Sequence, residues 1–574
     1  MSAPEHIATD VGAGKSGRIW YDEVRRYTHE LVTIRGVSPS RDENATGAAI
    51  HRLLSAALDG NASAEAGFDA IPGDPWERAN VWGVVPGASS KTVVLMGHFD
   101  TVGTEDYGAL EAWSLDPDGI VARLDTLSAT TPGLAADLAT HPGDWMFGRG
   151  VADMKSGVAI CIALMRHYAA LAREGRLPLT IVMIATPDEE NESAGARQAA
   201  RFLAGMRQSR GLTYAGAINT DFVTARFPDD DKRPVYTGSI GKLLPCFFLA
   251  GRASHAGEPF AGVDANLLLA ALVSEFDMNP SYCERVRGQT TPPPVTLRAT
   301  DTKSLYNTQI PTGATLYLNL LTMERTPGEA LAMLRAGAED ALARALARVS
   351  DAAGVWEALH GSPPPGWSGP LTGSVLSWAE LRAEVAARLG EETLATALSE
   401  EWSRWPAEVD KRTLASALVQ RLWTLSGREG PAAVLYFAPP WYPATPAVAS
   451  PLLDALRAVL AARPHDSLVE EEYFPLLSDM SYLRLDPAVD PTAIREQTPT
   501  WRDQPADGAL PSGAYGLPLE AMRALDMPVI DIGPYGRDAH QRGERALASF
   551  SFEIAPQVIA EVIAQLAERL GAQD

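Results

Sequence analysis

The sequence is poor in cysteine and histidine, which narrows the chemistry that it can carry. Its 574 residues include three cysteines and ten histidines. Three cysteines cannot form a disulfide framework, and none belongs to a C-x-x-C pair, so a thiolate zinc site is not expected. This cysteine usage fits a reducing compartment, and we expect a cytoplasmic protein.

Basic charge and long apolar runs are scarce as well. The formal net charge of -23 argues against nucleic acid or an anionic membrane as partner, because both need a basic protein face. We expect no apolar stretch of the roughly 20 residues that span a bilayer. The first residues also lack a basic segment followed by an apolar run, so we expect no secretory signal.

What the chain does contain is typical of a soluble globular protein of more than one domain. Hydrophobic residues make up 46% and charged residues 21%, and 574 residues exceed the size of one ordinary core. The pattern predicts one domain in two parts, 1–236 and 446–574. A second domain lies between them at 237–445 and carries a helical insertion near 350–430.

The first part alternates strand-like and helix-like segments, which is typical of an α/β layer fold. Short runs rich in β-branched residues predict buried strands at 92–98, 179–186 and 214–220. Apolar spacing predicts a helix over 156–175, ending at Gly175. A further buried strand is expected at 527–534, after the chain returns to this domain.

The second domain has a different order of elements. Strand, helix, two strands and helix are predicted at 241–257, 264–276, 294–300, 313–323 and 327–349. This order is most of a ferredoxin-like unit, whose missing final strand we expect at 432–443. The insertion begins with a Pro/Gly-rich segment and continues with two or three amphipathic helices, which we expect to cover one face.

Polar side chains follow the buried strands of the first domain. In open α/β sheets, ligands bind outside the carboxyl ends of the strands. Oxygen and imidazole ligands without thiolate suit Zn, Mn or Co, and an excess of acids can hold two ions. The residues at these positions, with one acid from a Gly-rich turn before a helix, are His98, Asp100, Asp153, Glu189, Glu190, Asp221 and His540.

Each of these residues also has a plainer interpretation. A lone histidine is more often structural than a ligand. Asp153 could cap the helix that follows it, Asp221 could close a turn, and His540 could be a surface residue. The acidic run Asp188–Glu190 could be a solvated turn, since ionised carboxylates are costly to bury without a compensating charge. The joint pattern along one sheet edge favours a metal site.

The order of motifs resembles a known family, the dinuclear zinc hydrolases that include aminoacylase, acetylornithine deacetylase and succinyl-diaminopimelate desuccinylase. The segments are "GHFDTV", "GRGVADMKSG", "DEENESAGA", an acid after the next strand, and "GPYGRDAHQRGE". Three others, "YNTQIPTGA", "VLYFAPPWYP" and "LLSDMSYLRL", look most like the arginine-utilisation, RocB-like branch. The resemblance covers nearly the whole chain except 350–430. It implies a zinc-hydrolase catalytic domain in two parts and a ferredoxin-like lid and dimerisation domain.

The resemblance also implies a ligand set for two divalent ions, zinc with cobalt or manganese as alternatives. Asp153 would bridge the two ions. His98 and Asp221 would complete one site, and Glu190 with His540 the other.

Other roles follow from the same resemblance. Asp100 would hydrogen-bond the His98 imidazole and fix its tautomer. Glu189 would be the general base in hydrolysis of an amide or peptide bond by a two-metal-activated water. His255 would donate to the oxyanion, often from the partner subunit of a homodimer. Asp188 would be a turn residue or would support the ligands from behind, and no chemistry is assigned to it.

The substrate implied is a small amino-acid derivative or short peptide, and its exact nature stays open. Many family members hold the substrate carboxylate with an arginine on the strand at 313–323, where this sequence has leucines and an asparagine. Arg325 lies past the expected end of that strand. Either the substrate has no free carboxylate, or another group such as Arg252 or Arg537 binds it. Dipeptidase, N-acyl-amino-acid deacylase and carbamoyl-amide hydrolase therefore all remain.

Rival functions fit the sequence less well. The glycine-rich segment 12–17 lacks the leading glycine of a phosphate loop and follows no strand. Ser254 lacks the G-x-S-x-G spacing of a nucleophile elbow. A non-catalytic metal- and ligand-binding protein that kept the fold is the main alternative, although the base and all five ligand positions are present. A purely structural metal site would leave Glu189 unexplained.

Overall fold

The computed structural model describes residues 19–227, 229–505 and 507–571. The chain forms two compact units. Unit 1 comprises Met1–Ser239, Thr445–Asp486 and Pro518–Asp574, and unit 2 comprises Ile240–Ala444 and Pro487–Leu517. The rejected phosphate-loop segment 12–17 lies outside the described residues.

Unit 1 is built on an 8-stranded mixed sheet. Its strands, in spatial order, are β1 (Glu65–Ala70), β2 (Ala79–Val85), β5 (Thr180–Thr186), β3 (Lys91–His98), β6 (Thr213–Asn219), β16 (Val529–Asp531), β7 (Arg233–Ser239) and β15 (Leu468–Phe474). Strand β3 runs parallel to β5 and β6, and β16 runs parallel to β6. The carboxyl ends of these four strands therefore meet at one edge of the sheet.

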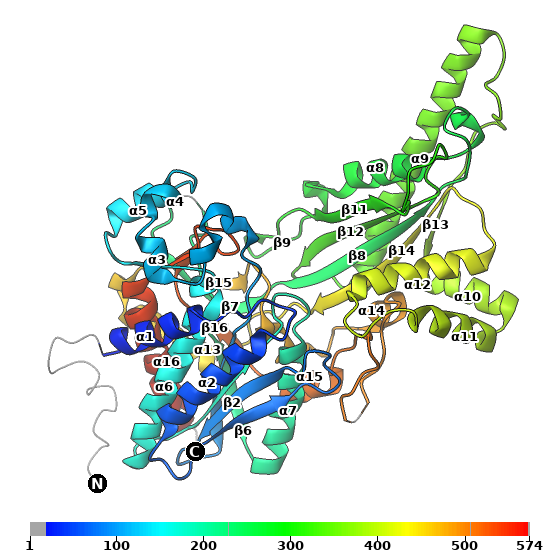
Figure 1. Cartoon of the computed structure of the whole chain (residues 1–574). Helices are drawn as coiled ribbons and strands as arrows, with labels where there is room; N and C mark the ends of the chain where they lie inside the picture. The colour runs from blue at the N-terminus through cyan, green and yellow to red at the C-terminus, as the bar shows by residue number, and fades with distance from the viewer. Residues whose placement is uncertain (1–18, 228, 506, 572–574) are drawn as a thin grey trace. The chain divides into compact units, whose positions relative to one another are not determined.

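Helices cover both faces of this sheet (Figure 1). A Cβ added at Gly83 would meet Leu54 of α2 (Glu43–Leu58) and Met165 of α6 (Ser156–Arg173). The neighbouring Trp82 ring instead packs against Phe202 of α7 (Ala194–Arg210). Because successive side chains of a strand point to opposite faces, α2 and α6 lie on one face and α7 on the other. The predicted α/β layer fold is confirmed.

The remaining long helices of unit 1 include one that corrects an expectation. They are α1 (Tyr21–Val32), α13 (Pro451–Ala462) and α16 (Ala555–Gly571). The segment Phe550–Gly571 is long and apolar enough to cross a membrane by length and composition, contrary to the expectation that no such stretch exists. In the structure its Val558, Ile559 and Leu566 are buried, and α16 packs against α13. The helix α16 is therefore a core helix of unit 1.

Unit 2 contains the predicted ferredoxin-like arrangement. Its elements are β8 (Gly241–Ala250), α8 (Ala265–Phe276), β11 (Val295–Asp301), β12 (Gly313–Thr322), α9 (Pro327–His360) and β14 (Ala432–Tyr442). The sheet order is β11-β12-β8-β14, with the short strand β13 (Ser374–Ser377) added beside β14. The final strand expected at 432–443 is thus β14, next to β8.

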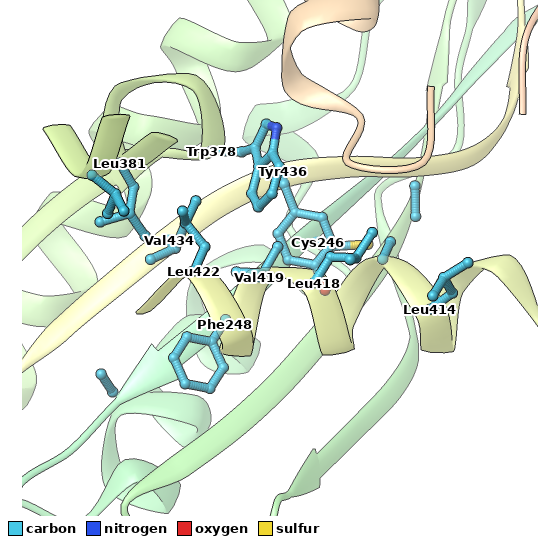
Figure 2. Packing of buried hydrophobic residues seen from close by; sticks show 14 of the residues in the cluster. Cys246, Phe248, Trp378, Leu381, Leu414, Leu418, Val419, Leu422, Val434 and Tyr436 are labelled. Carbon is cyan, nitrogen blue, oxygen red and sulfur yellow. The ribbon is translucent and has the colours of Figure 1, made fainter. Parts of the chain in front are cut away.

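The helical insertion covers one face of this second sheet. It consists of α10 (Trp378–Leu389), α11 (Glu391–Trp402) and α12 (Lys411–Ser426). Phe248 of β8 faces Trp423 of α12, whereas its neighbour Phe247 stacks on Phe276 of α8 on the opposite face. Figure 2 shows the apolar cluster that joins α10 and α12 to β8 and β14. The insertion is therefore part of the core of unit 2.

One segment differs from the sequence expectation. The sequence pattern predicts that residues 487–517 belong to the second part of the first domain, but Pro487–Leu517 belongs to unit 2. The indole nitrogen of Trp402 donates to the Ser512 carbonyl at 2.8 Å, and the Tyr515 hydroxyl accepts from the Trp441 amide at 2.9 Å. These contacts join residues far apart in the chain, so local periodicity carries no sign of them.

Candidate metal centre

The side chains predicted to form a site lie at the carboxyl edge of the unit 1 sheet. His98 is the last residue of β3, Glu189 and Glu190 follow β5, and Asp221 follows β6. Asp153 lies in the turn just before α6. Parallel strands thus bring together acids and a histidine from segments more than a hundred residues apart.

His540 reaches this edge from a small hairpin. It lies between β17 (Gly536–Arg537) and β18 (Arg545–Leu547). Its φ of 61° is in the left-handed region, which is uncommon for a residue other than glycine and costs about 1–3 kcal/mol. The hairpin pairs with β4 (Trp145–Phe147), and this frame holds the strained residue in place.

The ligand-type atoms form three groups, of which one contains His98, Glu189 and Glu190 and the other two share one carboxylate. His98, Asp153 and Asp221 offer atoms within 4.8 Å of one another, and so do Asp153, Glu190 and His540. Asp153 Oδ1 lies 3.0 Å from His98 Nε2, and Asp153 Oδ2 lies 3.1 Å from His540 Nε2. Each oxygen of Asp153 therefore faces a different histidine, as expected of a carboxylate that bridges two ions.

The charges of this cluster are unbalanced. Burial and the nearby Asp153 raise the pKa of Asp221 to about 7. Burial also raises the pKa of Glu190, again with the charge of Asp153 contributing. For His540, burial lowers the pKa, but hydrogen bonds with Asp153 and Glu190 outweigh it and raise the pKa to about 11. Divalent cations fit this donor set, because they would neutralise acids that otherwise repel one another.

The site opens to solvent on the His540 side. The His540 side chain is 48% exposed, whereas that of His98 is 1% exposed. The Nε2 atom of His540 nevertheless points inward and lies 3.0 Å from Glu190 Oε1. His540 is therefore a surface residue along the outer edge of its ring, while the edge that carries Nε2 faces the cluster.

Asp100 organises the turn that carries the two glutamates. Its Oδ1 accepts from the Glu189 amide at 3.1 Å and its Oδ2 from the Glu190 amide at 3.0 Å. The Nδ1 of His98 lies 3.2 Å from the Asp100 carbonyl and 3.5 Å from Oδ1 of its carboxylate. The nearest group to the Nδ1 atom of His98 is thus the Asp100 backbone carbonyl, while the Asp100 carboxylate mainly binds the two amides.

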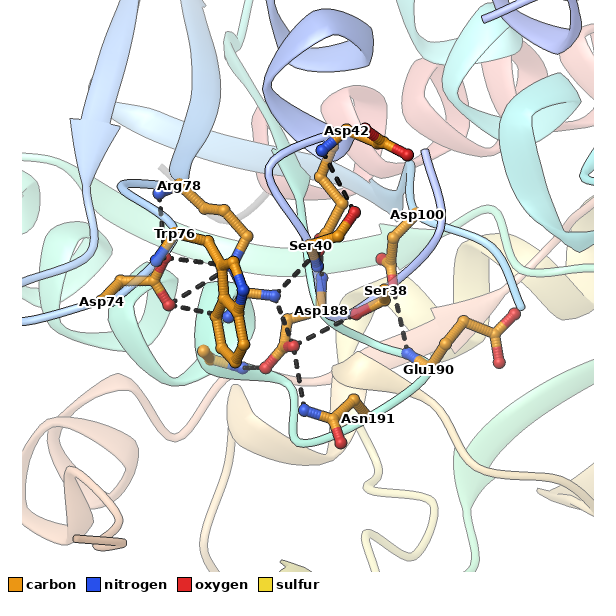
Figure 3. Close-up of polar contacts among 12 residues, drawn as sticks. Ser38, Ser40, Asp42, Asp74, Trp76, Arg78, Asp100, Asp188, Glu190 and Asn191 are labelled. Atoms are coloured by element: carbon orange, nitrogen blue, oxygen red, sulfur yellow. Dashed lines mark hydrogen bonds and ion pairs between the residues drawn. The ribbon is translucent and has the colours of Figure 1, made fainter. Parts of the chain in front are cut away.

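The first acid of the run, Asp188, points toward Arg78 and Ser38 (Figure 3). Its carboxylate accepts from Arg78 Nη1 at 2.5 Å and from the Ser38 hydroxyl at 3.2 Å, and the Ala194 amide donates to its other oxygen. The Asp188 amide donates to buried Glu43. Its assignment to the turn, without a role in chemistry, agrees with these contacts.

The sequence did not single out three further buried acids around the cluster. Asp531 accepts from the Asp221 amide at 2.9 Å, and Asp479 accepts from the Thr186 hydroxyl at 2.6 Å. Glu544 accepts from the Asp153 amide at 3.2 Å and pairs with Arg149. Asp531 lies within the strand expected at 527–534 and is the last residue of β16, so its position at the sheet edge is the available signal. Asp479 and Glu544 lie in the segments "LLSDMSYLRL" and "GPYGRDAHQRGE", but nothing local marks them as neighbours of the cluster.

Candidate groups from the second domain lie in unit 2. His255 is exposed, and its Nδ1 accepts from the Gly257 amide at 3.0 Å. Its part in the site stays a prediction. Arg325 lies past the end of β12, as expected, and donates to the Tyr282 carbonyl at 2.9 Å, which ties it to the fold.

Comparison with known proteins agrees with this architecture. Residues 94–495 match the family described as Peptidase family M20/M25/M40. The uncharacterized protein YqjN of Bacillus subtilis (strain 168) is 32% identical over 480 residues, covering 83% of this chain and 84% of that protein. Protein RocB of the same organism is 28% identical over 510 residues, covering 87% and 86%.

A solved structure shares the fold. A tripeptidase (SAV1512) from Staphylococcus aureus aligns with a TM-score of 0.50 at 12% identity, covering 96% of this chain and 100% of that chain. The family implies divalent metal ions, in agreement with the two ligand groups. The chain belongs to peptidase family M20/M25/M40, in its RocB-like branch, and is a metal-dependent amidohydrolase or peptidase.

Proposed function

We propose that unit 1 hydrolyses an amide or peptide bond in a small amino-acid derivative or short peptide, with two zinc ions. The residues that would hold them are His98, Asp153 and Asp221 for one ion, and Asp153, Glu190 and His540 for the other. Imidazole and carboxylate donors without thiolate support zinc, cobalt or manganese, and zinc is the ion that this donor set binds most commonly in hydrolases.

The position of Glu189 is the observation that carries this proposal. A carboxylate oxygen of Glu189 lies within 4.8 Å of ligand atoms of His98 and Glu190, yet Glu189 belongs to neither proposed ligand set. Burial, with the charge of Glu190 contributing, raises the pKa of Glu189 well above its usual value. A carboxylate tuned upward beside the ligands suits proton transfer near neutral pH.

Two divalent ions, when bound, lower the pKa of a water molecule and polarise the carbonyl of the substrate. Glu189 accepts a proton from that water as the new C–O bond forms. It then delivers the proton to the nitrogen as the C–N bond breaks, so that an acid and an amine leave. Asp100 fixes the backbone of Glu189 and Glu190 through their amides and thereby holds the base in position.

A direct test uses a substrate panel. Purified protein loaded with zinc, cobalt or manganese is incubated with N-acyl amino acids, N-carbamoyl amino acids and dipeptides, and released amine is followed. Glu189→Gln should lower turnover by about 10²–10⁴-fold while the bound metal is retained. Glu174→Gln, an exposed glutamate paired with Arg176, is the matched control and should leave turnover unchanged.

The outcomes separate the two candidate functions. Turnover lost in Glu189→Gln alone establishes the hydrolase and its substrate class. Ligand binding by calorimetry with no turnover, in protein that holds two ions per chain, would favour the non-catalytic binding protein. His255→Gln, tested on the same panel, should lower turnover if His255 donates to the oxyanion.

We also propose a homodimer that pairs through β11. This strand is at the edge of the unit 2 sheet and exposes Val295 (39%) and Leu297 (52%). Edge strands with exposed apolar side chains are templates for pairing with another chain. Light scattering should show a dimer that Leu297→Lys dissociates, whereas Leu359→Lys, exposed on α9, should have no effect. A monomeric wild-type chain would contradict this.

A further inference from the structure

Unit 2 contains a cavity that the proposed hydrolysis does not use. Its volume is about 770 Å³, within the range of pockets that hold small organic ligands. It is lined by α10, by α11 and by the segment Pro487–Leu517. The ferredoxin-like strands contribute nothing to its wall, so the cavity is a product of the two segments added to that unit.

Three tryptophans line this cavity, namely Trp378, Trp402 and Trp501. Two of the indoles are fixed by their N–H groups, since Trp402 donates to the Ser512 carbonyl at 2.8 Å and Trp501 donates to Asp503 at 3.0 Å. Figure 2 shows the nitrogen of Trp378 on the side of its ring away from the labelled leucines of α12. Trp378 and Trp501 are 5% and 7% exposed, whereas Trp402 is half-buried, so Trp402 offers the larger stacking surface to a flat ligand.

The same cavity gathers positive charge. Its lining includes Arg382, Arg495 and Arg502 but a single acidic residue, Glu496. This excess of cations occurs in a chain whose net charge is -23. Anionic ligands are bound well by guanidinium groups, which donate in a planar fork.

Arg502 is the guanidinium best placed for a ligand. It lies over the ring of Trp402, 4.6 Å from the ring centroid, and its Nη1 donates to the Trp501 carbonyl at 2.5 Å. Arg382 pairs with Glu391, and Arg495 pairs with Asp503. Among the described residues, Arg502 forms no ion pair with a carboxylate. Burial and the charge of Arg382 lower the pKa of Arg502, a repulsion that a bound anion would relieve.

We propose that this cavity is a second ligand site, which binds a small organic anion carrying a flat ring. The ring would stack among the tryptophans, and the anionic group would face Arg502 and Arg382. Its lining includes none of the residues proposed for hydrolysis, and its test does not depend on turnover. The competing explanation is a water-filled gap left where Pro487–Leu517 packs on α10 and α11.

A set of three probes distinguishes these explanations. Naphthalenesulfonate carries both a flat ring and an anion, naphthalenemethanol has the ring alone, and methanesulfonate has the anion alone. Sulfonates are weak metal ligands, so the proposed zinc site competes little. Calorimetry or saturation-transfer NMR on the full-length, metal-loaded protein should show naphthalenesulfonate binding at least about tenfold more tightly than either partial probe.

Substitutions then locate the site. Arg502→Gln should weaken naphthalenesulfonate binding about tenfold, and Arg502→Lys should retain part of the affinity because it keeps the charge. Arg404→Gln is the matched control, since Arg404 is exposed, pairs with Glu401 and lies outside the lining. Arg382→Gln is a second test on a side chain that is 38% exposed, should Arg502→Gln fail to fold.

Three results would overturn the proposal. The first is the absence of binding by naphthalenesulfonate. The second is equal affinity for naphthalenemethanol, which would show that the anion is not recognised. The third is unchanged affinity in folded Arg502→Gln and Arg382→Gln, which would place the ligand elsewhere.

Discussion

Two carboxylates of one turn, Asp188 and Glu190, have opposite surroundings. The Asp188 side chain is 1% exposed and that of Glu190 7%, and both residues lie in the turn that follows β5. Asp188 meets the guanidinium of Arg78, a cation that the chain itself supplies. Glu190 meets Asp153 and His540, neighbours that include another acid. The comparison teaches that the neighbours, and not the acid itself, decide whether a buried carboxylate is structural or needs an external cation.

Loss of Arg78, the cation that the chain itself supplies to Asp188, should have the largest effect on the free energy of unfolding. Arg78 is 2% exposed and contacts Glu43, Asp74 and Asp188. Arg78→Met removes the positive partner of these acids and should lower the free energy of unfolding by about 3–5 kcal/mol, measured by urea denaturation. Arg41→Met, at an exposed pair with Glu77, should change it by less than about 0.5 kcal/mol. A similar fall in the free energy of unfolding for Arg78→Met and Arg41→Met would contradict a structural role of the buried cation.

Binding of zinc, the external cation, should have the next largest effect on the free energy of unfolding. Zinc at about a hundred times its dissociation constant should stabilise the wild type by about 2.7 kcal/mol, because it binds the folded state. Removing the metal with a chelator should reverse this. Asp153→Asn should lose most of the stabilisation, since Asp153 belongs to both ligand groups. An equal zinc effect in wild type and Asp153→Asn would place the ions elsewhere.

Support of the turn by Asp100 should matter less. Asp100→Asn keeps the shape but weakens the acceptor for the Glu189 and Glu190 amides. Metal affinity should fall by about 10–100-fold, the range seen when groups that orient ligands are altered. Competition with a chromogenic chelator measures it. Asp118→Asn, an exposed acid near His29, should have no effect, and a fall there of the same size would indicate a nonspecific change.

The pH dependence of metal binding should be the smallest effect. The pKa of Asp221 is raised to about 7 and that of His540 to about 11, so at pH 7 the metal-free protein holds protons that ions must displace. Affinity should therefore rise as pH rises from about 6 to about 8, by up to about tenfold per pH unit for each displaced proton. Calorimetry in buffers of different ionisation enthalpy counts the protons released. Affinity that is flat over this range would contradict the charge imbalance.

The sequence predicted the parts of the fold that depend on local pattern. The buried strands β3, β5 and β6 were expected from their apolar runs, and β14 from the need for a last ferredoxin-like strand. The structure also brings together all five residues expected as ligands. Four of them end or follow a strand of the sheet or precede a helix at its carboxyl edge, and His540 reaches the same edge from the hairpin between β17 and β18. Their roles remain proposals.

Other features had no local signal. The pair Arg78–Asp188 joins residues 110 positions apart, and Glu544 reaches back 391 positions to the Asp153 amide. Packing of Pro487–Leu517 into unit 2 likewise depends on single hydrogen bonds, such as that between Trp402 and Ser512. Contacts of this kind follow from the assembled fold and not from periodicity, so a single sequence does not reveal them.

The most direct test of the contrast between Asp188 and Glu190 is the number of ions bound per folded chain, measured by native mass spectrometry in zinc. The wild type should hold two ions, Glu190→Ala should hold one, and Asp188→Asn should still hold two despite reduced stability. Two ions in Glu190→Ala, or a loss in Asp188→Asn equal to that in Glu190→Ala, would contradict the assignment of the two carboxylates.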